Sequence, residues 1–258
     1  MAEVLHSLSG HVATITLLNE GRYNAMSMAM WLQLAATLAE LDADPNVRAV
    51  VLRGDGEKAF VSGADISEFG EKRNDPASVA AYDSAVANAQ AALAGFRCPV
   101  IAAISGICYG GGLGLILACD LRFASPTAKF RMPAARLGLG YAYNGMKRMA
   151  AVLGVARASE VFYTANVYSA DDALRIGLVS GLHEDVFAAA SETAAVIASN
   201  APLTIRAGKQ AFNTLLAGGD PADVAAVDAA VKACFKSEDY AEGRAAFSDK
   251  RTPQFKGR

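Results

Sequence analysis

The stretch Gly106-Ile107-Cys108-Tyr109-Gly110-Gly111-Gly112-Leu113-Gly114 contains five glycines in nine residues. The apolar segment 98–105 before it predicts a buried strand, and the apolar segment 115–118 after it predicts a buried helix. A strand, a glycine turn and a helix present free backbone N–H groups at the helix N-terminus, where they can bind an anion or a developing oxyanion. A close-packed turn without room for side chains needs the same glycines. The stretch alone leaves both interpretations open.

Length and composition indicate a folded globular protein. The 258 residues suffice for one large domain or two small ones, and 53% of them are hydrophobic and 19% charged. The net charge of −2 argues against nucleic acid or an anionic membrane as the main partner. The chain has no apolar run of about 18 residues or more, and its first residues do not resemble a secretory signal. We therefore expect a cytoplasmic protein without a membrane span.

Cysteine and histidine usage argues against a metal centre. The four cysteines follow no metal-binding spacing, so reduced thiols are the simplest interpretation. Cys108 could be a nucleophile, but apolar neighbours and the lack of a nearby histidine favour a buried, inert thiol. The three histidines are scattered, which argues against a histidine metal site and against a Ser-His-Asp triad.

Strand-like segments dominate the first half of the chain, and helix-like segments dominate the last third. Alternating or apolar β-rich runs predict strands at 11–18, 47–53, 59–61, 98–105, 119–124 and 129–131. Capping residues and helix-starting prolines predict helices that begin near Ser27, Asp75, Ser169, Ala201, Asp220 and Ser237. One more helix is expected to begin after Asp65. The strand–turn–helix theme recurs without a tight sequence period.

Five segments, in the right order, resemble the crotonase (enoyl-CoA hydratase/isomerase) superfamily. They cover essentially the whole chain and are 22–26, 59–66, 99–120, 169–179 and 237–255. The resemblance implies an α/β fold, the crotonase (ClpP-like) spiral of ββα units, with a C-terminal helical trimerisation region. We accordingly expect a core domain at 1–200 that binds acyl-CoA and a helical region at 201–258. It also implies a homotrimer or a hexamer.

The same resemblance implies an acyl-CoA thioester as the substrate. Coenzyme A is then part of the substrate, and no separate cofactor and no metal are expected. Two backbone N–H groups would hold the thioester oxygen as it gains enolate character, and the matching residues are Ala64 and Gly111. The other positions that would contact the CoA or acyl part are Arg22, Tyr23, Ala25, Ser62, Asp65, Ile66, Gly110, Ala134 and Lys250. For Arg22, Tyr23 and Lys250, a solvated surface position is the alternative; Lys250 could act from its own or a neighbouring subunit.

The chain departs from the family's hydratases at two positions. The resemblance places their two catalytic glutamates at Gly114 and Ala134, and neither residue can transfer a proton. General acid–base residues contribute about 10²–10⁴-fold each, so hydration through this pair is doubtful. The isomerases of the family use the second position, so isomerisation is doubtful as well.

The order Leu-Gly-x-x-Tyr at residues 137–141 resembles the family's acyl-CoA decarboxylases. There, the tyrosine that matches Tyr141 orients the carboxylate of the substrate. Loss of CO2 forms the thioester enolate directly, so no carboxylate base is required. Tyr141 could donate a hydrogen bond to that carboxylate, and Arg131 or Arg136 could supply charge. A packing role for Tyr141 and a structural ion pair for Arg136 are the alternatives.

We therefore expect an acyl-CoA enzyme that stabilises an enolate, with decarboxylase-like lyase chemistry. One alternative is a hydratase or isomerase that uses another acid or base, with Glu68 or Tyr141 as candidates. For Glu68, an exposed helical position is the competing interpretation. The other alternative, from a different functional class, is a non-catalytic acyl-CoA-binding protein.

Overall fold

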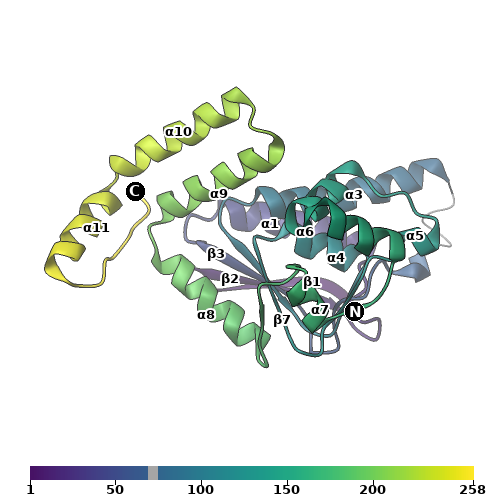
Figure 1. The fold of residues 1–258 in the computed structure, drawn as a ribbon. Helices are drawn as coiled ribbons and strands as arrows, with labels where there is room; N and C mark the ends of the chain where they lie inside the picture. The colour runs from purple at the N-terminus through teal and green to yellow at the C-terminus, as the bar shows by residue number, and fades with distance from the viewer. Residues whose placement is uncertain (69–74) are drawn as a thin grey trace.

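The computed structural model describes residues 1–68 and 75–258, apart from the Ile66 side chain. Its larger sheet has the strand order β1-β2-β3-β5-β7-β10 among the described residues (Figure 1). β1 pairs antiparallel with β2, and every later neighbour in this order is parallel. The strands are β1 (Ala2–Ser9), β2 (Val12–Asn19), β3 (Ala49–Gly54), β5 (Val100–Ile104), β7 (Leu121–Ala124) and β10 (Gly181–Leu182).

A smaller sheet contains β4 (Ala59–Val61), β6 (Ile107–Tyr109), β8 (Lys129–Arg131) and β9 (Tyr168–Ser169), in that order. The pairs β3 and β4, β5 and β6, and β7 and β8 each supply one strand to each sheet before the chain enters a helical segment. This is a spiral of ββα units, and it confirms the predicted α/β class. Four strands were not predicted from the sequence: β1, whose residues are mostly exposed, β6, which lies inside the glycine stretch, and the two-residue strands β9 and β10.

Helices cover both faces of the larger sheet. The outer face, with Ala49 and Val51 of β3, packs against α8 (Val186–Ser199), while Val50 and Leu52 face the main core. The remaining helices of this part are α1 (Met28–Ala43), α3 (Pro76–Gly95), α4 (Gly111–Ala118), α5 (Ala134–Leu137), α6 (Tyr143–Thr164) and α7 (Ala170–Arg175).

Local capping explains where several helices begin. The side chain of Ser27 accepts from the N–H of Met30, and Asp75 and Ser169 each form a capping box, as predicted. After Asp65 the chain forms a short 3-10 helix, η1 (Ile66–Glu68). The rest of the helix expected there lies outside the described residues.

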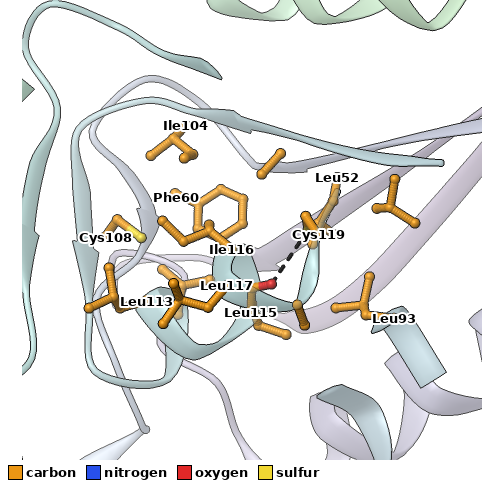
Figure 2. Packing of buried hydrophobic residues seen from close by; sticks show 14 of the residues in the cluster. Leu52, Phe60, Leu93, Ile104, Cys108, Leu113, Leu115, Ile116, Leu117 and Cys119 are labelled. Atoms are coloured by element: carbon orange, nitrogen blue, oxygen red, sulfur yellow. Dashed lines mark hydrogen bonds between the residues drawn. The ribbon is translucent and has the colours of Figure 1, made fainter. Parts of the chain in front are cut away.

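The short helix α4 is enclosed by the core on all sides. Residues 112–118 are all buried, and Figure 2 shows Leu113, Ile116 and Leu117 packed among side chains from β3, β4, β5 and α3. Full burial of a leucine or isoleucine side chain contributes about 1.5–3 kcal/mol. This burial fixes the N-terminus of α4 relative to the small sheet.

The last helices form an arm that extends from the body in Figure 1: α9 (Pro202–Ala217), α10 (Pro221–Phe235) and α11 (Glu238–Asp249). α10 contains no buried residue. The arm encloses an apolar groove of about 770 Å³. Large side chains on the arm are exposed, and Phe247 is the extreme case at 89%. Within the described residues, no helix combines the length and apolar character needed to cross a membrane.

An ion pair between a buried lysine and a partly exposed aspartate joins the arm to the body. Lys209 of α9 is 5% exposed, and its Nζ lies 2.8 Å from Oδ2 of Asp120. The same Nζ donates to the carbonyl oxygen of Cys98 at 2.8 Å, and Oδ2 of Asp120 also accepts from the N–H of Val100 at 2.7 Å. A buried charge needs such partners because desolvation costs several kcal/mol.

Replacement of Lys209 by methionine should lower the free energy of unfolding by about 1.5–3 kcal/mol, because the partly exposed carboxylate of Asp120 and the carbonyl oxygen of Cys98 lose a charged hydrogen-bond donor. Lys58→Met, at an exposed lysine, is the matched control and should change it by about 0.5 kcal/mol or less. Urea unfolding measures both. Equal stability of the two variants would show that the ion pair does not hold the arm.

Candidate active site

Three loops meet where adjacent parallel strands of the small sheet end. They follow β4, β6 and β8, and they contain Ala64, Gly111 and Ala134 respectively. Gly110 lies at their junction. A Cβ atom built on it would lie 3.7 Å from Cδ of Pro133 and 3.8 Å from Cα of Gly63. The structure thus brings together Ala64, Gly110, Gly111 and Ala134, which the sequence predicted as parts of one site.

The N–H of Ala64 is turned away from the strand-like segment beside it. In the isolated parallel bridge between Met26 and Ala64, the N–H of Met26 donates to Gly63 O at 2.8 Å, and the N–H of Asp65 donates to Met26 O at 3.0 Å. A residue flanked in this way directs its own N–H to the opposite side. Among the described residues, no acceptor bonds it.

Gly111 is the first residue of α4, so its N–H has no partner within the helix. The preceding Gly110 has φ 51° and ψ −109° and offers no side chain to cap the helix. The N–H of Gly110 is occupied by Arg131 O at 2.9 Å, and the first helical bond runs from Gly114 N–H to Gly110 O at 3.1 Å. The Gly111 N–H is therefore available at the positive end of the helix dipole.

Close packing also requires these glycines. A Cβ atom on Gly112 would lie 2.6 Å from the carbonyl oxygen of Val61, and one on Gly111 would lie 3.1 Å from Cζ2 of Trp31. The packing interpretation of the glycine stretch is confirmed, because the glycines let α4 approach β4. That approach leaves the N–H groups of Ala64 and Gly111 without acceptors among the described residues, and their binding of an anion stays a prediction.

The loop that carries Ala64 is held by the carboxylate of Asp65. Oδ1 of Asp65 lies 2.9 Å from Nη1 of Arg22 and accepts from the hydroxyl of Ser67 at 2.7 Å. Burial raises the pKa of Asp65, but the hydrogen bonds from Ser67 and Asn19 and the charge of Arg22 outweigh it and leave the pKa below its ordinary value. The Asp65 side chain is ionised and positions the loop.

The remaining positions near this loop lie along the segment 22–25. Tyr23 is exposed with φ 51°, and its carbonyl oxygen accepts from the N–H of Ser62 at 3.1 Å. The hydroxyl of Ser62 donates to Arg22 O at 3.2 Å, and Ala25 is buried. The side chain of Ile66 lies outside the described residues.

Lys250 is not brought to this site within one chain. It caps the end of α11, and Figure 1 places α11 at the opposite side of the molecule from α4. Its side chain is exposed.

Gly114 and Ala134 are both buried, and neither supplies an ionisable side chain. The space beside Gly114 is taken by two polar groups instead. A Cβ atom built on Gly114 would lie 2.5 Å from Nε2 of Gln90 and 3.1 Å from Oη of Tyr141. Gly114 follows Gly111 by one helical turn, so these polar groups lie close to the free N–H of Gly111.

The ring of Tyr141 is packed against its neighbours, and its hydroxyl lies beside Gly114. Its ring meets that of Phe162 edge-on at 5.9 Å, and a Cβ atom on Gly145 would lie 2.3 Å from its Cε1. Burial raises the pKa of Tyr141 to about 12, although the charge of Arg148 opposes the shift. The hydroxyl therefore stays protonated at neutral pH and can donate a hydrogen bond.

The sequence analysis missed Gln90 and Arg148. Arg148 Nη1 donates to Oε1 of Gln90 at 3.4 Å. The signal for Gln90 was available: it is an amide on the buried side of α3, beside Ala89 and Leu93. Arg148 carries no comparable signal, because it lies in a long helix with mixed polarity.

Of three other candidates, two have structural partners. Nε of Arg131 donates to Ala165 O at 2.9 Å, and Oε2 of Glu68 accepts from the N–H of Met28 at 2.8 Å, which caps α1. Arg136 is exposed at the end of α5. Glu68 lies in the 3-10 helix η1 and is half-buried, which fits the helical part of the competing interpretation but not full exposure.

The thiol chemistry is as predicted: burial raises the pKa of Cys108 well above its ordinary value, so the thiol is inert. In the described part of the chain, no group of three or more histidine, cysteine, aspartate or glutamate side chains could hold a metal ion.

Comparison with known proteins places this architecture in a family. The family model for enoyl-CoA hydratase/isomerase matches residues 7–258. A short-chain-enoyl-CoA hydratase from Clostridium acetobutylicum is 34% identical over 96% of this chain and 95% of its own length. A crotonyl-CoA hydratase from Syntrophomonas wolfei is 32% identical over 90% of this chain and 89% of its own.

Solved structures agree with the sequence comparison. The crystal structure of an enoyl-CoA hydratase/carnithine racemase from Magnetospirillum magneticum has a TM-score of 0.91 and 37% identity, covering 100% of this chain and 97% of that one. An enoyl-CoA hydratase from Bacillus anthracis has a TM-score of 0.93 and 32% identity, covering 99% of both chains. The chain therefore belongs to the enoyl-CoA hydratase/isomerase family.

Proposed function

We propose that the enzyme removes CO2 from an acyl-CoA thioester that carries a carboxylate on the carbon next to the thioester carbonyl. One observation carries the proposal: the side chains beside Gly114 are the Tyr141 hydroxyl and the Gln90 amide, and neither Gly114 nor Ala134 provides a carboxylate. Neutral donors suit an anionic substrate group, whereas a glutamate there would repel it.

The backbone N–H groups of Ala64 and Gly111 are the proposed oxyanion donors. Neither N–H has an acceptor among the described residues. The two residues follow β4 and β6, which are adjacent parallel strands of the small sheet. Preorganised donors of this kind stabilise charge that develops in the transition state, and loss of one typically costs about 2.7–4 kcal/mol.

The reaction needs no protein base. The bond between the α-carbon and the carboxylate carbon breaks, and its electron pair forms the carbon–carbon double bond of the enolate. The thioester oxygen takes the negative charge, which Ala64 and Gly111 stabilise, and CO2 leaves. A proton from water then adds to the α-carbon and restores the thioester. The Tyr141 hydroxyl, protonated up to about pH 12, holds the carboxylate in line for departure.

Hydration is the second candidate, and the names of the relatives favour it: those from Clostridium acetobutylicum and Syntrophomonas wolfei are hydratases. It would need another group to activate water. Glu68 already accepts the N–H of Met28, and Tyr141 is a neutral phenol, so neither is a ready base. This is why decarboxylation is preferred.

Coenzyme A is proposed to lie along the segment 22–25 and the loop 62–66, with Lys250 contributed by a neighbouring subunit. The exposed apolar side chains of the arm support a trimer or hexamer, because such surface is costly in water; they include Phe212, Leu215, Phe235 and Phe247. The free cysteines are compatible with a reduced, cytoplasmic setting.

Two assays test the reaction. Purified enzyme should release CO2 from malonyl-CoA and leave acetyl-CoA, and it should not hydrate crotonyl-CoA at a comparable rate. Hydration without CO2 release would establish the second candidate. Binding of acyl-CoA without turnover of any thioester would indicate a non-catalytic binding protein.

Gly111→Pro isolates the proposed oxyanion donor. Proline is tolerated at the first position of a helix, and it lacks the N–H. Gly111→Ala is the control: it keeps the N–H but adds the same Cβ beside Trp31. Relative to the alanine variant, kcat for CO2 release should fall about 10²–10³-fold. Equal rates in the two variants would remove Gly111 from the oxyanion hole.

The raised pKa of Tyr141 gives a prediction for pH. Below pH 10 the Tyr141 phenol is protonated in both the folded and the unfolded chain, and the stability that its raised pKa contributes to the folded state is fully present. This stability is lost as the pH rises through about 12. Activity should therefore show no loss from Tyr141 up to pH 10, whereas Tyr141→Phe should be slower by about tenfold or more throughout. A pH–rate profile of both proteins checks this. The prediction would be contradicted if the activity of the wild type fell with a midpoint well below pH 10 while the activity of Tyr141→Phe did not.

A further inference from the structure

Two hydrogen-bond donors lie beside Gly114 and a third lies behind one of them, with too few acceptors for the group. They are the hydroxyl of Tyr141, the amide nitrogen of Gln90 and the guanidinium of Arg148. Among the described residues, the bonds of this group amount to one contact of 3.4 Å, from Arg148 to Oε1 of Gln90. A half-buried cluster rich in donors is suited to an anion.

Arg148 differs in its surroundings from the arginines that are held by ion pairs or by several carbonyl oxygens. Arg22, Arg157 and Arg251 each pair with a carboxylate, and Arg122 donates to three backbone carbonyl oxygens. Arg148 is half-buried, and within the described chain no carboxylate is among the groups that shift its pKa. Burial lowers the pKa of Arg148, so its environment disfavours the positive charge until an anion arrives.

Gln90 is directed by this arginine. The side chain is buried, with the residue 7% exposed, on the face of α3 that packs against α4. Because Arg148 donates to Oε1, the amide nitrogen Nε2 is the atom that faces Gly114. Nε2 has no acceptor among the described residues and is free to donate to a ligand.

We propose that Arg148, Gln90 and Tyr141 form a subsite that selects acyl-CoA thioesters with a carboxylate in the acyl group, and that Arg148 determines this specificity. The inference rests on the proposed function, since it assumes that the thioester oxygen binds Ala64 and Gly111. It assigns to Arg148 the role suggested from the sequence for Arg131, whose Nε donates to Ala165 O, and for Arg136, which is exposed.

The spacing fits a carboxylate close to the thioester. Gly114 lies three residues after Gly111, which corresponds to about 4.5 Å along a helix axis. A carboxylate on the α-carbon is separated from the thioester oxygen by a similar short span. Tyr141 and Gln90 are the donors nearest Gly114, and Arg148 stands behind Gln90.

Arg148 should act on binding more than on the chemical step. Negative charge leaves the carboxylate as the enolate forms, so a cation beside the carboxylate favours the bound substrate at least as much as the transition state. Arg148→Met should therefore raise KM for malonyl-CoA by more than it lowers kcat.

The decisive experiment is calorimetric binding of sulfoacetyl-CoA and acetyl-CoA to the full-length protein. Both carry the same thioester, and the sulfonate keeps the negative charge but cannot leave as CO2. Wild type should bind sulfoacetyl-CoA about tenfold to hundredfold more tightly than acetyl-CoA, the range for hydrogen bonds to a charged group. Arg148→Met should remove this preference. Arg157→Met, on the same helix but exposed and paired with Glu160, should retain it.

The outcomes separate this inference from the proposed function. The subsite is overturned if Arg148→Met keeps the preference for sulfoacetyl-CoA over acetyl-CoA, or if wild type shows no such preference. The measurement on wild type decides this even if the variant does not fold. CO2 release without dependence of binding on Arg148 also overturns the subsite, while the proposed function stands. An Arg148-dependent preference without CO2 release supports the subsite and contradicts decarboxylation.

Discussion

The close approach of α4 to β4 is the contact on which the site depends. Gly112 has no side chain, so the backbone of α4 can lie against the carbonyl of Val61, where a Cβ atom would come within 2.6 Å. Burial of α4 in the core then fixes its N-terminus beside the loop that follows β4. Two backbone N–H groups, that of Ala64 in the loop after β4 and that of Gly111 at the start of α4, are thereby held at one place without any side chain.

From this contact the polar surroundings follow. Gly114 leaves room one turn further along α4, and that room is occupied by Tyr141 and Gln90, with Arg148 behind them. Two sets of donors therefore lie close together, each with too few acceptors among the described residues. We propose that the backbone N–H groups of Ala64 and Gly111 bind an oxyanion and that this side-chain cluster binds a second anion. An acyl-CoA with a carboxylate would satisfy both sets at once.

Short-range patterns in the sequence predicted much of the fold. Helix starts at Ser27, Asp75 and Ser169 could be predicted because capping depends on neighbouring residues. β1 was missed because its side chains are mostly exposed, and the position of β6 was obscured by the glycines around it. Of the cluster beside Gly114, Tyr141 was predicted as a site residue, but its grouping with Gln90 and Arg148 could not be predicted. Gln90 and Arg148 lie on separate helices, and only the packing of α3 and α6 around α4 brings them together.

The most direct measurement is a crystal structure of the protein with acetyl-CoA bound. The account predicts that the thioester oxygen lies about 2.7–3.1 Å from the backbone nitrogens of both Ala64 and Gly111, the range for oxyanion donors. The acetyl methyl group should then point toward Gly114 and Tyr141. A thioester oxygen bound elsewhere, with either N–H facing solvent, would contradict the account.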